Sequence, residues 1–360
     1  MKSSDVIVIG GGPAGCVTST QLSKAGFDVV QVASNDRRAD SPAEILGPNT
    51  LRFFETIGFK VPVDKTVQCR GILSRWVSDQ EQFSDYDLLD VRRGAVVQRA
   101  TFHAGLNEWA NQSGVRVWIG TTLKKALFNG QFWDCLLANH SGLTRLHARF
   151  IVDASGRGGS PIAGRDATRM FADRLVAIAT PVCVSESTDF LTIECSANGW
   201  WYIPPAIADR THLVYLTDFD ILPTKGQNRE EWLIDAFHQT RLLSGMMAYS
   251  PDFEQSRLLD ARFSARMKII DKNWACVGDA ALALDPLSGH GVDTALNGTL
   301  EAVQALIGLL KTKNTSSMES YCAWHIAELT NQRRLRFKLY GQVNPAVRCN
   351  TFWQRRAISS

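Results

Sequence analysis

The first residues that could do chemistry form a glycine-rich segment near the start of the chain. Residues 10–15 read Gly-Gly-Gly-Pro-Ala-Gly, satisfy G-x-G-x-x-G and follow an apolar run that starts at Asp5. Gly10 allows a tight turn, Gly12 lets the backbone approach a pyrophosphate, and Gly15 lets a helix pack closely on the strand. The helix N-terminus stabilises the phosphate charge. The segment predicts a dinucleotide site with these contacts: Gly10, Gly12, Pro13, Ala14 and Gly15.

The residue that should bind the adenosine ribose departs from this pattern. The second strand of such a unit normally ends in an acid, but Ala33 stands there, followed by Ser34 and Asn35. Either Ser34, Asn35 or a later residue makes the contact, or the adenosine is held more weakly. This position does not choose between NAD and FAD.

Two later motifs distinguish between NAD and FAD. Residues 153–156 read Asp-Ala-Ser-Gly after an apolar strand, and residues 274–291 contain Gly278-Asp279 followed by a Pro-x-x-Gly-x-Gly turn. With the first motif, in this order and at these spacings, the set resembles the FAD-dependent monooxygenases of the p-hydroxybenzoate hydroxylase fold. That superfamily includes the tryptophan halogenases and geranylgeranyl reductases. The resemblance implies that FAD is the cofactor.

The same resemblance implies roles for residues outside the glycine-rich segment. Asp279 would hydrogen-bond the ribityl chain, and the turn from Pro286 to Gly291 would lie beside the isoalloxazine ring. Amides at the start of the helix after Gly291 could stabilise negative charge on the reduced ring. Arg99 matches an arginine that these families place early in a helix to contact FAD. The implied FAD contacts are Ser34, Arg99, Asp153, Gly156, Gly278, Asp279, Pro286, Gly289 and Gly291.

A narrower resemblance concerns the substrate. Residues 199–204, Gly-Trp-Trp-Tyr-Ile-Pro, are similar to the W-x-W-x-I-P segment of tryptophan halogenases, but here the two tryptophans are adjacent. Halogenases also need a lysine for hypohalous acid. With Trp76 as the register, Gln68 stands at that place, and Lys60 and Lys65 lie nearby. Halogenation is therefore the alternative reading.

The whole pattern is more similar to the halogenase-like flavoproteins that mature tryptophylquinone enzymes by hydroxylating a tryptophan in a partner polypeptide. The matching features are Glu44 with Pro48, Arg99, the segment 199–202, Thr217-Asp218 and the run 278–288. The resemblance implies hydroxylation of an indole, or of a partner's tryptophan, through a flavin C4a-hydroperoxide. A prenyl reductase and a non-catalytic FAD-fold binding protein are further alternatives.

Five residues are candidates for substrate binding and catalysis. Trp200, Trp201 and Tyr202 could form an aromatic wall, since indole stacks well on another ring. They could equally form an alternating strand with one face in the core, so at most one tryptophan would face the substrate. Glu44 is a candidate acid or base and His290 a candidate donor to the flavin; each could instead be an exposed loop residue.

Composition and charge narrow the class further. The 360 residues are 45% hydrophobic and 21% charged with a formal net charge of +3, which is ordinary for a globular enzyme and too small to suggest a nucleic-acid partner. We expect no membrane span, because no run reaches about 18 apolar residues, and no signal peptide. Eight scattered cysteines without C-x-x-C favour no metal site and a reducing cytoplasm.

The order of elements predicts an α/β protein in which a Rossmann-like FAD-binding domain is interleaved with a mostly antiparallel substrate sheet. The predicted ranges are 1–75, 95–165 and 265–310 for the FAD-binding domain, 76–94 and 166–264 for the substrate domain, and 311–360 for a C-terminal helical region. We expect one long helical region from Gly291 to about Tyr340 and an open substrate face. There is no second G-x-G-x-x-G, so NAD(P)H would visit transiently or a partner reductase would supply electrons, with O2 as co-substrate.

Overall fold

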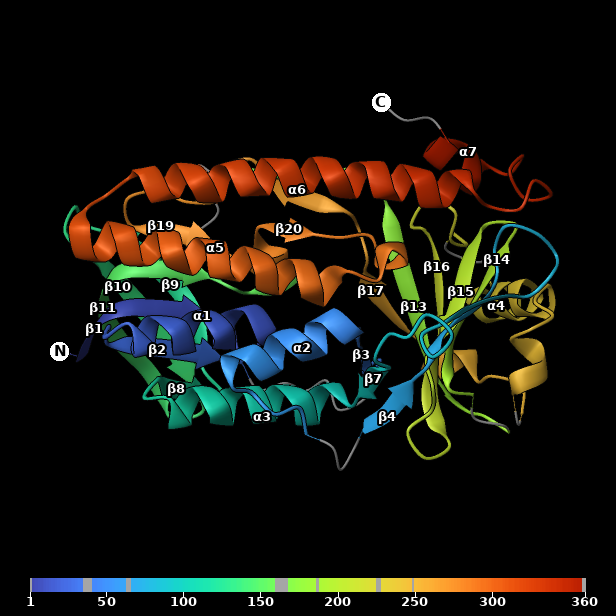
Figure 1. Cartoon of the computed structure of the whole chain (residues 1–360), viewed down its shortest axis with the longest axis horizontal. Coiled ribbons are helices and arrows are strands. Elements are labelled where there is room, and N and C mark those ends of the chain that lie inside the picture. Colours follow the sequence, from blue (N-terminus) through green and yellow to red (C-terminus); the bar gives the residue numbers. More distant parts are fainter. Residues whose placement is uncertain are drawn as a thin grey trace.

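The computed structural model describes residues 2–34, 41–62, 66–158, 168–185, 188–224, 228–247 and 249–357. The structure contains two large sheets. One lies toward the end of the long axis that holds the N-terminus, and the other lies at the opposite end (Figure 1). Helix α6 (Ser316–Gly341) runs along one side of both. The predicted fold class is confirmed.

In the first sheet, strand β1 leads into the glycine-rich segment. The strand order of this sheet is β8-β2-β1-β11-β10-β9, and β19 also pairs with β11. The strands of the parallel part are β8 (Arg116–Ile119), β2 (Val29–Ala33), β1 (Lys2–Ile9), β11 (Gly142–Asp153) and β19 (Trp274–Cys276). The predicted hairpin at 131–152 is present as β10 (Trp133–Asn139) and β11, extended by β9 (Thr122–Phe128). The parallel strands therefore end at one edge, where ligands bind in such sheets.

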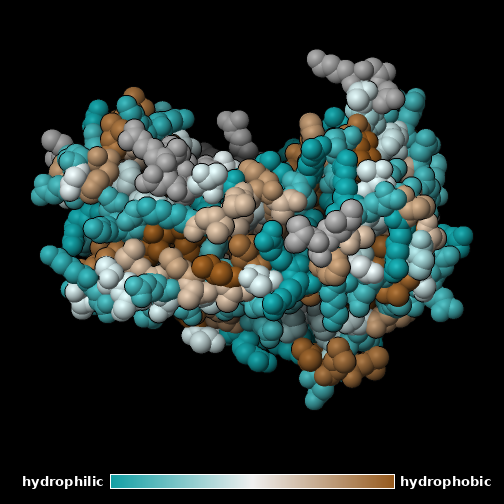
Figure 2. Space-filling view, turned by 90° about the horizontal axis from the view of Figure 1, so that it is seen from above, coloured by the Kyte–Doolittle hydropathy of each residue, from teal (hydrophilic) through white to brown (hydrophobic). Residues whose placement is uncertain are grey.

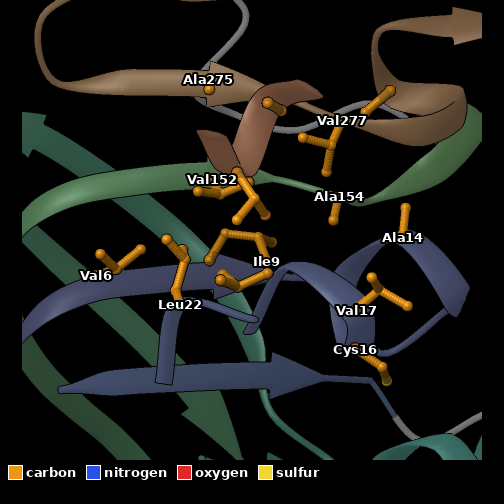
Figure 3. Packing of buried hydrophobic residues seen from close by; sticks show 14 of the residues in the cluster. Val6, Ile9, Ala14, Cys16, Val17, Leu22, Val152, Ala154, Ala275 and Val277 are labelled. Atoms are coloured by element: carbon orange, nitrogen blue, oxygen red, sulfur yellow. The ribbon is translucent and has the colours of Figure 1, made fainter. Parts of the chain in front are cut away.

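Helices α1, α3 and α5 pack together against this sheet. Strands β1 and β2 are buried on both sides, which is why they read as continuous apolar runs. Helix α1 (Pro13–Lys24) packs on α5 (Gly291–Thr312) and α3 (Arg99–Gln112). Figure 3 shows Val17 and Leu22 of α1 packed against Ile9 and Val152, with Val277 on the other side of the β11 chain. This buried hydrophobic core holds the loops at the strand ends in place.

The second sheet has the order β17-β13-β16-β15-β14-β5-β6. Its strands are β17 (Arg257–Asp260), β13 (Leu175–Cys183), β16 (Arg210–Asp218), β15 (Gly199–Ile203), β14 (Phe190–Ser196), β5 (Gly71–Arg75) and β6 (Gln82–Asp85). Only the β14–β5 pair is parallel; the other described pairs are antiparallel. Because β5 belongs here, this sheet begins at Gly71, a few residues before the predicted boundary at 76.

The two faces of the second sheet pack against different elements. One face packs on α4 (Arg229–His238), at the end of the molecule remote from the first sheet (Figure 1). The other packs on the end of α6 and on α7 (Thr351–Ala357). Two small sheets complete the described chain, with α2 (Pro48–Ile57) following the first strand of one of them. They are β3 (Glu44–Leu46), β7 (Gly94–Val97) and β4 (Thr66–Cys69), and β12 (Arg169–Phe171), β18 (Ser264–Arg266) and β20 (Leu282–Ala283).

The helical region expected from Gly291 to about Tyr340 consists of two helices. Helix α5 ends before Lys313, whose φ of 54° is in the left-handed region, and α6 starts at Ser316 and runs back along α5. The C-terminal end of α6 therefore returns to the second sheet, where Tyr340 joins the core. Within the described residues, no helix is long and apolar enough to cross a membrane.

Candidate functional site

The glycine-rich loop is locked against the end of strand β11. Gly10 has a φ of +134°, and a Cβ placed on it would lie 2.1 Å from the carbonyl oxygen of Ala154. A Cβ on Gly15 would lie 2.1 Å from the carbonyl oxygen of Gly10. Neither contact is possible for a real side chain, so these two positions require glycine. Gly12 differs, because its Cβ would meet no protein atom within 4 Å.

The open space at Gly12 fits a pyrophosphate. Gly12 is the N-cap of α1, Pro13 starts the helix, and no acidic residue stands in the first turn. The free amides and the helix dipole at this end favour an anion. Ala14 packs beside Gly278, where a Cβ would lie 2.6 Å from that of Ala14. The N-terminal motif and the Gly-Asp motif therefore meet at one place.

The end of β2, where the ribose-binding acid is missing, lies close to the glycine-rich loop. A Cβ on Gly11 would lie 2.5 Å from that of Ala33, so β2 passes close to the loop. Ser34 follows and is exposed, while Asn35 lies outside the described residues. Asn107 of α3 donates to the carbonyl of Gly11 at 2.9 Å and accepts from the Gln31 amide at 2.7 Å. Sequence reasoning missed Asn107, because nothing in its neighbourhood marks a contact so distant in the chain.

Asp153 is fully buried at the end of β11. One carboxylate oxygen accepts from the backbone N–H of Ser155 at 3.0 Å and from its hydroxyl at 2.6 Å. The other is buried and has no hydrogen-bond partner among the described residues. Burial raises the pKa of Asp153, and the bonds from Ser155 oppose that shift. Gly156 follows in the left-handed region with a φ of +72°, so this motif shapes the loop that supports Gly10.

Asp279 contacts two arginines, Arg157 and Arg169. About a third of its side chain (34%) remains accessible, and its Oδ2 lies 3.3 Å from Nε of Arg157. Arg169 donates to the Asp279 carbonyl. Burial raises the pKa of Asp279, and the charge of Arg157 is the largest opposing effect. An acceptor that is held in place but still accessible suits a sugar-like chain of hydroxyl groups.

Glu44 and Arg99 form an ion pair near Asp279. Nε of Arg99 lies 2.8 Å from Oε1 of Glu44, and both side chains are partly accessible. Both charges act on Asp279 and on Tyr202. The pKa of Tyr202 is raised to about 12, chiefly by burial. The structure therefore brings together four of the residues predicted from sequence, although they come from four separate segments.

The predicted flavin turn is a short 3-10 helix, η7 (Pro286–Ser288). Asp285 caps it by accepting from the backbone N–H of Leu287 at 3.0 Å. Gly289 then adopts a φ of +65°, and Cβ atoms on Gly289 and Gly291 would meet nothing within 4 Å. The N-terminus of α5 is thus open to a ligand.

His290 lies at the same turn, is exposed and lines a cavity of about 440 Å³ between α5 and α6. Its backbone N–H lies 3.3 Å from the hydroxyl of Ser288. The structure does not bring its side chain into the Glu44–Arg99 group.

The two adjacent tryptophans of β15 face opposite sides of the second sheet. Trp201 is fully buried on the α4 side and stacks on Tyr215 with ring centroids 4.2 Å apart. Trp200 and Tyr202 share the other face. Trp200 donates to the hydroxyl of Tyr340 at 3.2 Å. Only this second face lies on the side of the flavin turn, because Leu287 packs against it.

That face is covered, in contrast to the open face expected from sequence. Trp353 of α7 lies 5.5 Å from Trp76, edge to face, and donates to the carbonyl of Ser196 at 2.9 Å. Trp76 also meets Trp200 edge to face at 6.0 Å. The aromatic residues therefore form a closed cluster around Trp200, with Tyr202 at its margin.

These observations define a flavoprotein site. The open amides at Gly12, the accessible Asp279 and the open turn at Gly289 and Gly291 lie on three motifs that pack together, and they fit the pyrophosphate, ribityl and ring parts of FAD. The family described as "FAD binding domain" matches residues 3–324. The chain belongs to this FAD-binding family, and its cofactor is FAD. The superfamily predicted from sequence is confirmed.

Individual relatives are more distant. A tryptophan 2-halogenase of Chondromyces crocatus is 25% identical over 86% of this chain, and the match spans 62% of the halogenase. The structure of the myxobacterial chondrochloren halogenase CndH is similar with a TM-score of 0.86 and 21% identity, covering 100% of this chain and 87% of that one. The peptidyl tryptophan dihydroxylase QhpG, essential for tryptophylquinone cofactor biogenesis, is similar with a TM-score of 0.81 and 21% identity, covering 98% and 78%. At this identity the two structures support the fold.

Proposed function

We propose that the protein is an FAD-dependent monooxygenase that hydroxylates an aromatic ring. The observation that carries this proposal is the group of Glu44, Arg99 and Tyr202 beside Asp279, on the one face of the second sheet that meets the flavin turn. Bound FAD, once reduced, would activate O2. One oxygen atom would enter the ring and the other would leave as water, with two electrons from NAD(P)H or a partner reductase.

The protein's own residues would orient the ring and handle protons. With a pKa near 12, Tyr202 keeps its phenolic proton at neutral pH and can donate a hydrogen bond. Glu44 is an acceptor held in place by Arg99, so it is suited to accept the proton that leaves the ring. The aromatic cluster around Trp200 would exclude water from the same face.

The substrate class that we favour is an indole or a tryptophan in a partner polypeptide. Tyr202, the partly exposed ring at the margin of the closed aromatic cluster, could offer a face to an indole, which would gain about 0.5–1.5 kcal/mol beyond its buried area. The likeness to the peptidyl tryptophan dihydroxylase supports this choice. Because α7 covers Trp200, a polypeptide would have to approach from the Tyr202 side.

Co-expression with genetically neighbouring polypeptides tests the proposal. We expect purified protein to contain FAD and a partner tryptophan to gain the mass of one or two oxygen atoms. Tyr202→Phe should lower this modification at least about tenfold while FAD is retained, whereas Tyr249→Phe, at a tyrosine that is 83% exposed, should not. If partners stay unmodified while a free aromatic compound turns over, the protein-substrate version is wrong. If the reduced protein consumes no O2 with any candidate, the monooxygenase proposal is wrong.

Halogenation is the second candidate, and the halogenase relatives favour it. The lysines argue against it within the described part of the chain. Gln68 accepts from Arg93 at 2.9 Å, and Lys60 is exposed. Lys268, the one described lysine that is not exposed, pairs with Asp271 at 2.6 Å; Lys65 lies outside the described residues. A chlorinated or brominated product that forms only when halide is present would establish this candidate instead.

A further inference from the structure

A second cavity, of about 490 Å³, lies where α6 and α7 meet the end of β16 and the start of β13 in the second sheet. Tyr340 forms part of its wall, and this size is within the range of small-molecule sites. Figure 2 looks down on this side of the molecule and shows hydrophilic residues interspersed with hydrophobic ones. Five arginines contribute to the lining: Arg174, Arg333, Arg336, Arg355 and Arg356.

Two of these arginines are held by buried acids. Arg336 donates to Asp285 at 2.9 Å and to Asp173 at 2.8 Å. Arg356 donates to Asp218 at 2.6 Å. Burial raises the pKa of Asp173, and the charge of Arg336 opposes that shift. These pairs fix the inner wall and leave little of its positive charge free.

The outer arginines are less completely neutralised. Arg174 and Arg355 share Asp220, and both are substantially exposed, at 68% and 41% of the side chain. Within the part of the chain that the structure describes, the guanidinium group of Arg333, on α6, has no hydrogen bond or ion pair. Five guanidinium groups thus meet four carboxylates, and the surplus positive charge lies at the mouth of the cavity.

The cavity also has an apolar side. Phe337 lies next to Arg336 on α6 and is 45% exposed, and the buried Phe263 lines the wall with it. An exposed ring beside an unpaired guanidinium suits a ligand with an anionic group on a compact apolar body. Guanidinium groups bind carboxylate and phosphate oxygens in a planar, two-point manner.

One wall of the cavity leads directly to the flavin turn. The same Asp285 that accepts from Arg336 caps η7, and it also lies 3.1 Å from the hydroxyl of Tyr340. An anion that attracts Arg336 would compete with Asp285 for that guanidinium. A ligand bound in the cavity would therefore change the environment of the flavin ring through the Arg336–Asp285 ion pair.

We propose that this cavity is a binding site for an organic anion, a carboxylate or a phosphate ester on a small apolar body, with Arg333 as its principal charge contact. The site is separate from the Glu44–Arg99 group and does not depend on the reaction proposed above. It stands on the geometry of the arginines and Phe337.

Calorimetric titration of the FAD-loaded protein tests the proposal with benzoate, phenyl phosphate and inorganic phosphate, and with benzamide as the neutral probe. We expect saturable binding of at least one anion, weakening as salt rises, and no binding of benzamide. Arg333→Gln should weaken that binding about tenfold or more. Arg334→Gln, at the adjacent exposed arginine that does not line the cavity, should leave it unchanged.

A second variant and an absorbance measurement test the apolar side of the site and its link to the flavin. Phe337→Ser should weaken phenyl phosphate more than inorganic phosphate, and bound anion should shift the visible absorbance of FAD in the wild type. A preference for benzoate over inorganic phosphate would identify a carboxylate ligand, and the reverse a phosphate ligand. If none of the three anions binds, or if Arg333→Gln binds as tightly as Arg334→Gln, the proposal is wrong. Because no turnover is measured, this outcome is independent of hydroxylation.

Discussion

The guanidinium of Arg356 lies 2.6 Å from one carboxylate oxygen of Asp218 and 3.1 Å from the other, and both side chains are almost fully buried. The arginine also lies over the ring of Phe352 at 3.7 Å. This pair attaches α7 to the end of β16, and α7 in turn places Trp353 on the cluster around Trp200.

Replacing Asp218 with Asn should therefore destabilise the packing of α7 on the second sheet. The change leaves the buried Arg356 without its charge partner, and breaking such a pair costs about 3–5 kcal/mol. We expect that loss in urea unfolding, together with faster proteolysis near residue 350. Asp220→Asn is the control, since this carboxylate is 30% accessible and pairs with exposed arginines; it should cost less than about 1 kcal/mol. Equal losses would contradict the role given to Asp218.

Gly10 and Gly12 should respond differently to alanine. At Gly10 the left-handed φ and the 2.1 Å approach to Ala154 mean that Gly10→Ala must shift the backbone, so we expect a loss of at least about 2 kcal/mol in apoprotein stability. Gly12→Ala has room in the protein and an ordinary φ of −84°, so the apoprotein should change by less than about 0.5 kcal/mol.

FAD affinity is a second measurement for the Gly12→Ala variant. The Cβ of Gly12→Ala would occupy the space that we assign to the pyrophosphate, so FAD should bind at least about tenfold more weakly although the apoprotein is stable. Fluorescence titration of the apoprotein with FAD measures this. Unchanged affinity would place the pyrophosphate elsewhere.

The adjacent tryptophans give a third prediction. Trp201→Phe should cost roughly 2 kcal/mol of stability, because it leaves space beside Tyr215 and Phe237, but turnover per folded molecule should not change. Trp200→Phe removes the bond to Tyr340 on the face that we assign to the substrate, so product formation should fall while FAD content stays constant. Mass spectrometry of the product and thermal unfolding check both, and a turnover defect confined to Trp201→Phe would reverse the assignment of faces.

Asp279 predicts a pH dependence of apoprotein stability. Its pKa is raised above the ordinary 3.8 in the folded state, so the folded protein holds the proton more tightly than the unfolded chain. The stability contributed by this group is fully present below 3.8 and is lost as pH rises through the raised pKa. Asp279→Asn carries no such charge, so the variant apoprotein should be more stable than the wild type near neutral pH.

That difference should shrink as the pH falls toward about 4, while the variant binds FAD more weakly at every pH. Thermal unfolding of both apoproteins across this range checks the prediction. A difference that grows on acidification would mean that pairing with Arg157, and not burial, dominates at this carboxylate.

The parts of the fold that could be predicted from sequence are those set by local pattern. The glycine-rich segment, the two later motifs, the hairpin at 131–152 and the β-rich stretch after 175 all depend on neighbours in the chain. The meeting of Glu44, Arg99 and Tyr202 beside Asp279 could be anticipated only through resemblance to a family, because 235 positions separate Glu44 from Asp279.

The remaining features depend on contacts that no local pattern encodes. Tyr340 reaches Asp285 across 55 positions, and Arg356 reaches Asp218 across 138. The basic residues near the C-terminus look like a solvated helix face in the sequence, since their acidic partners lie on distant strands. Which of the two tryptophans faces the flavin turn depends on the register of β15 with β16, and alternation alone leaves that choice open.

The close approach of Gly10 to Ala154 has a consequence for recombination. The first βαβ unit and the end of β11 fit together as a matched pair, backbone against backbone, with Gly15 closing the same contact from the helix side. A chimera that takes its first 30 or so residues from a relative should inherit a working nucleotide loop only if the segment around Ala154 comes from the same parent. Gly10 and Ala154 are 144 positions apart, so the segments around them should be exchanged together, and a breakpoint that separates them should be unfavourable.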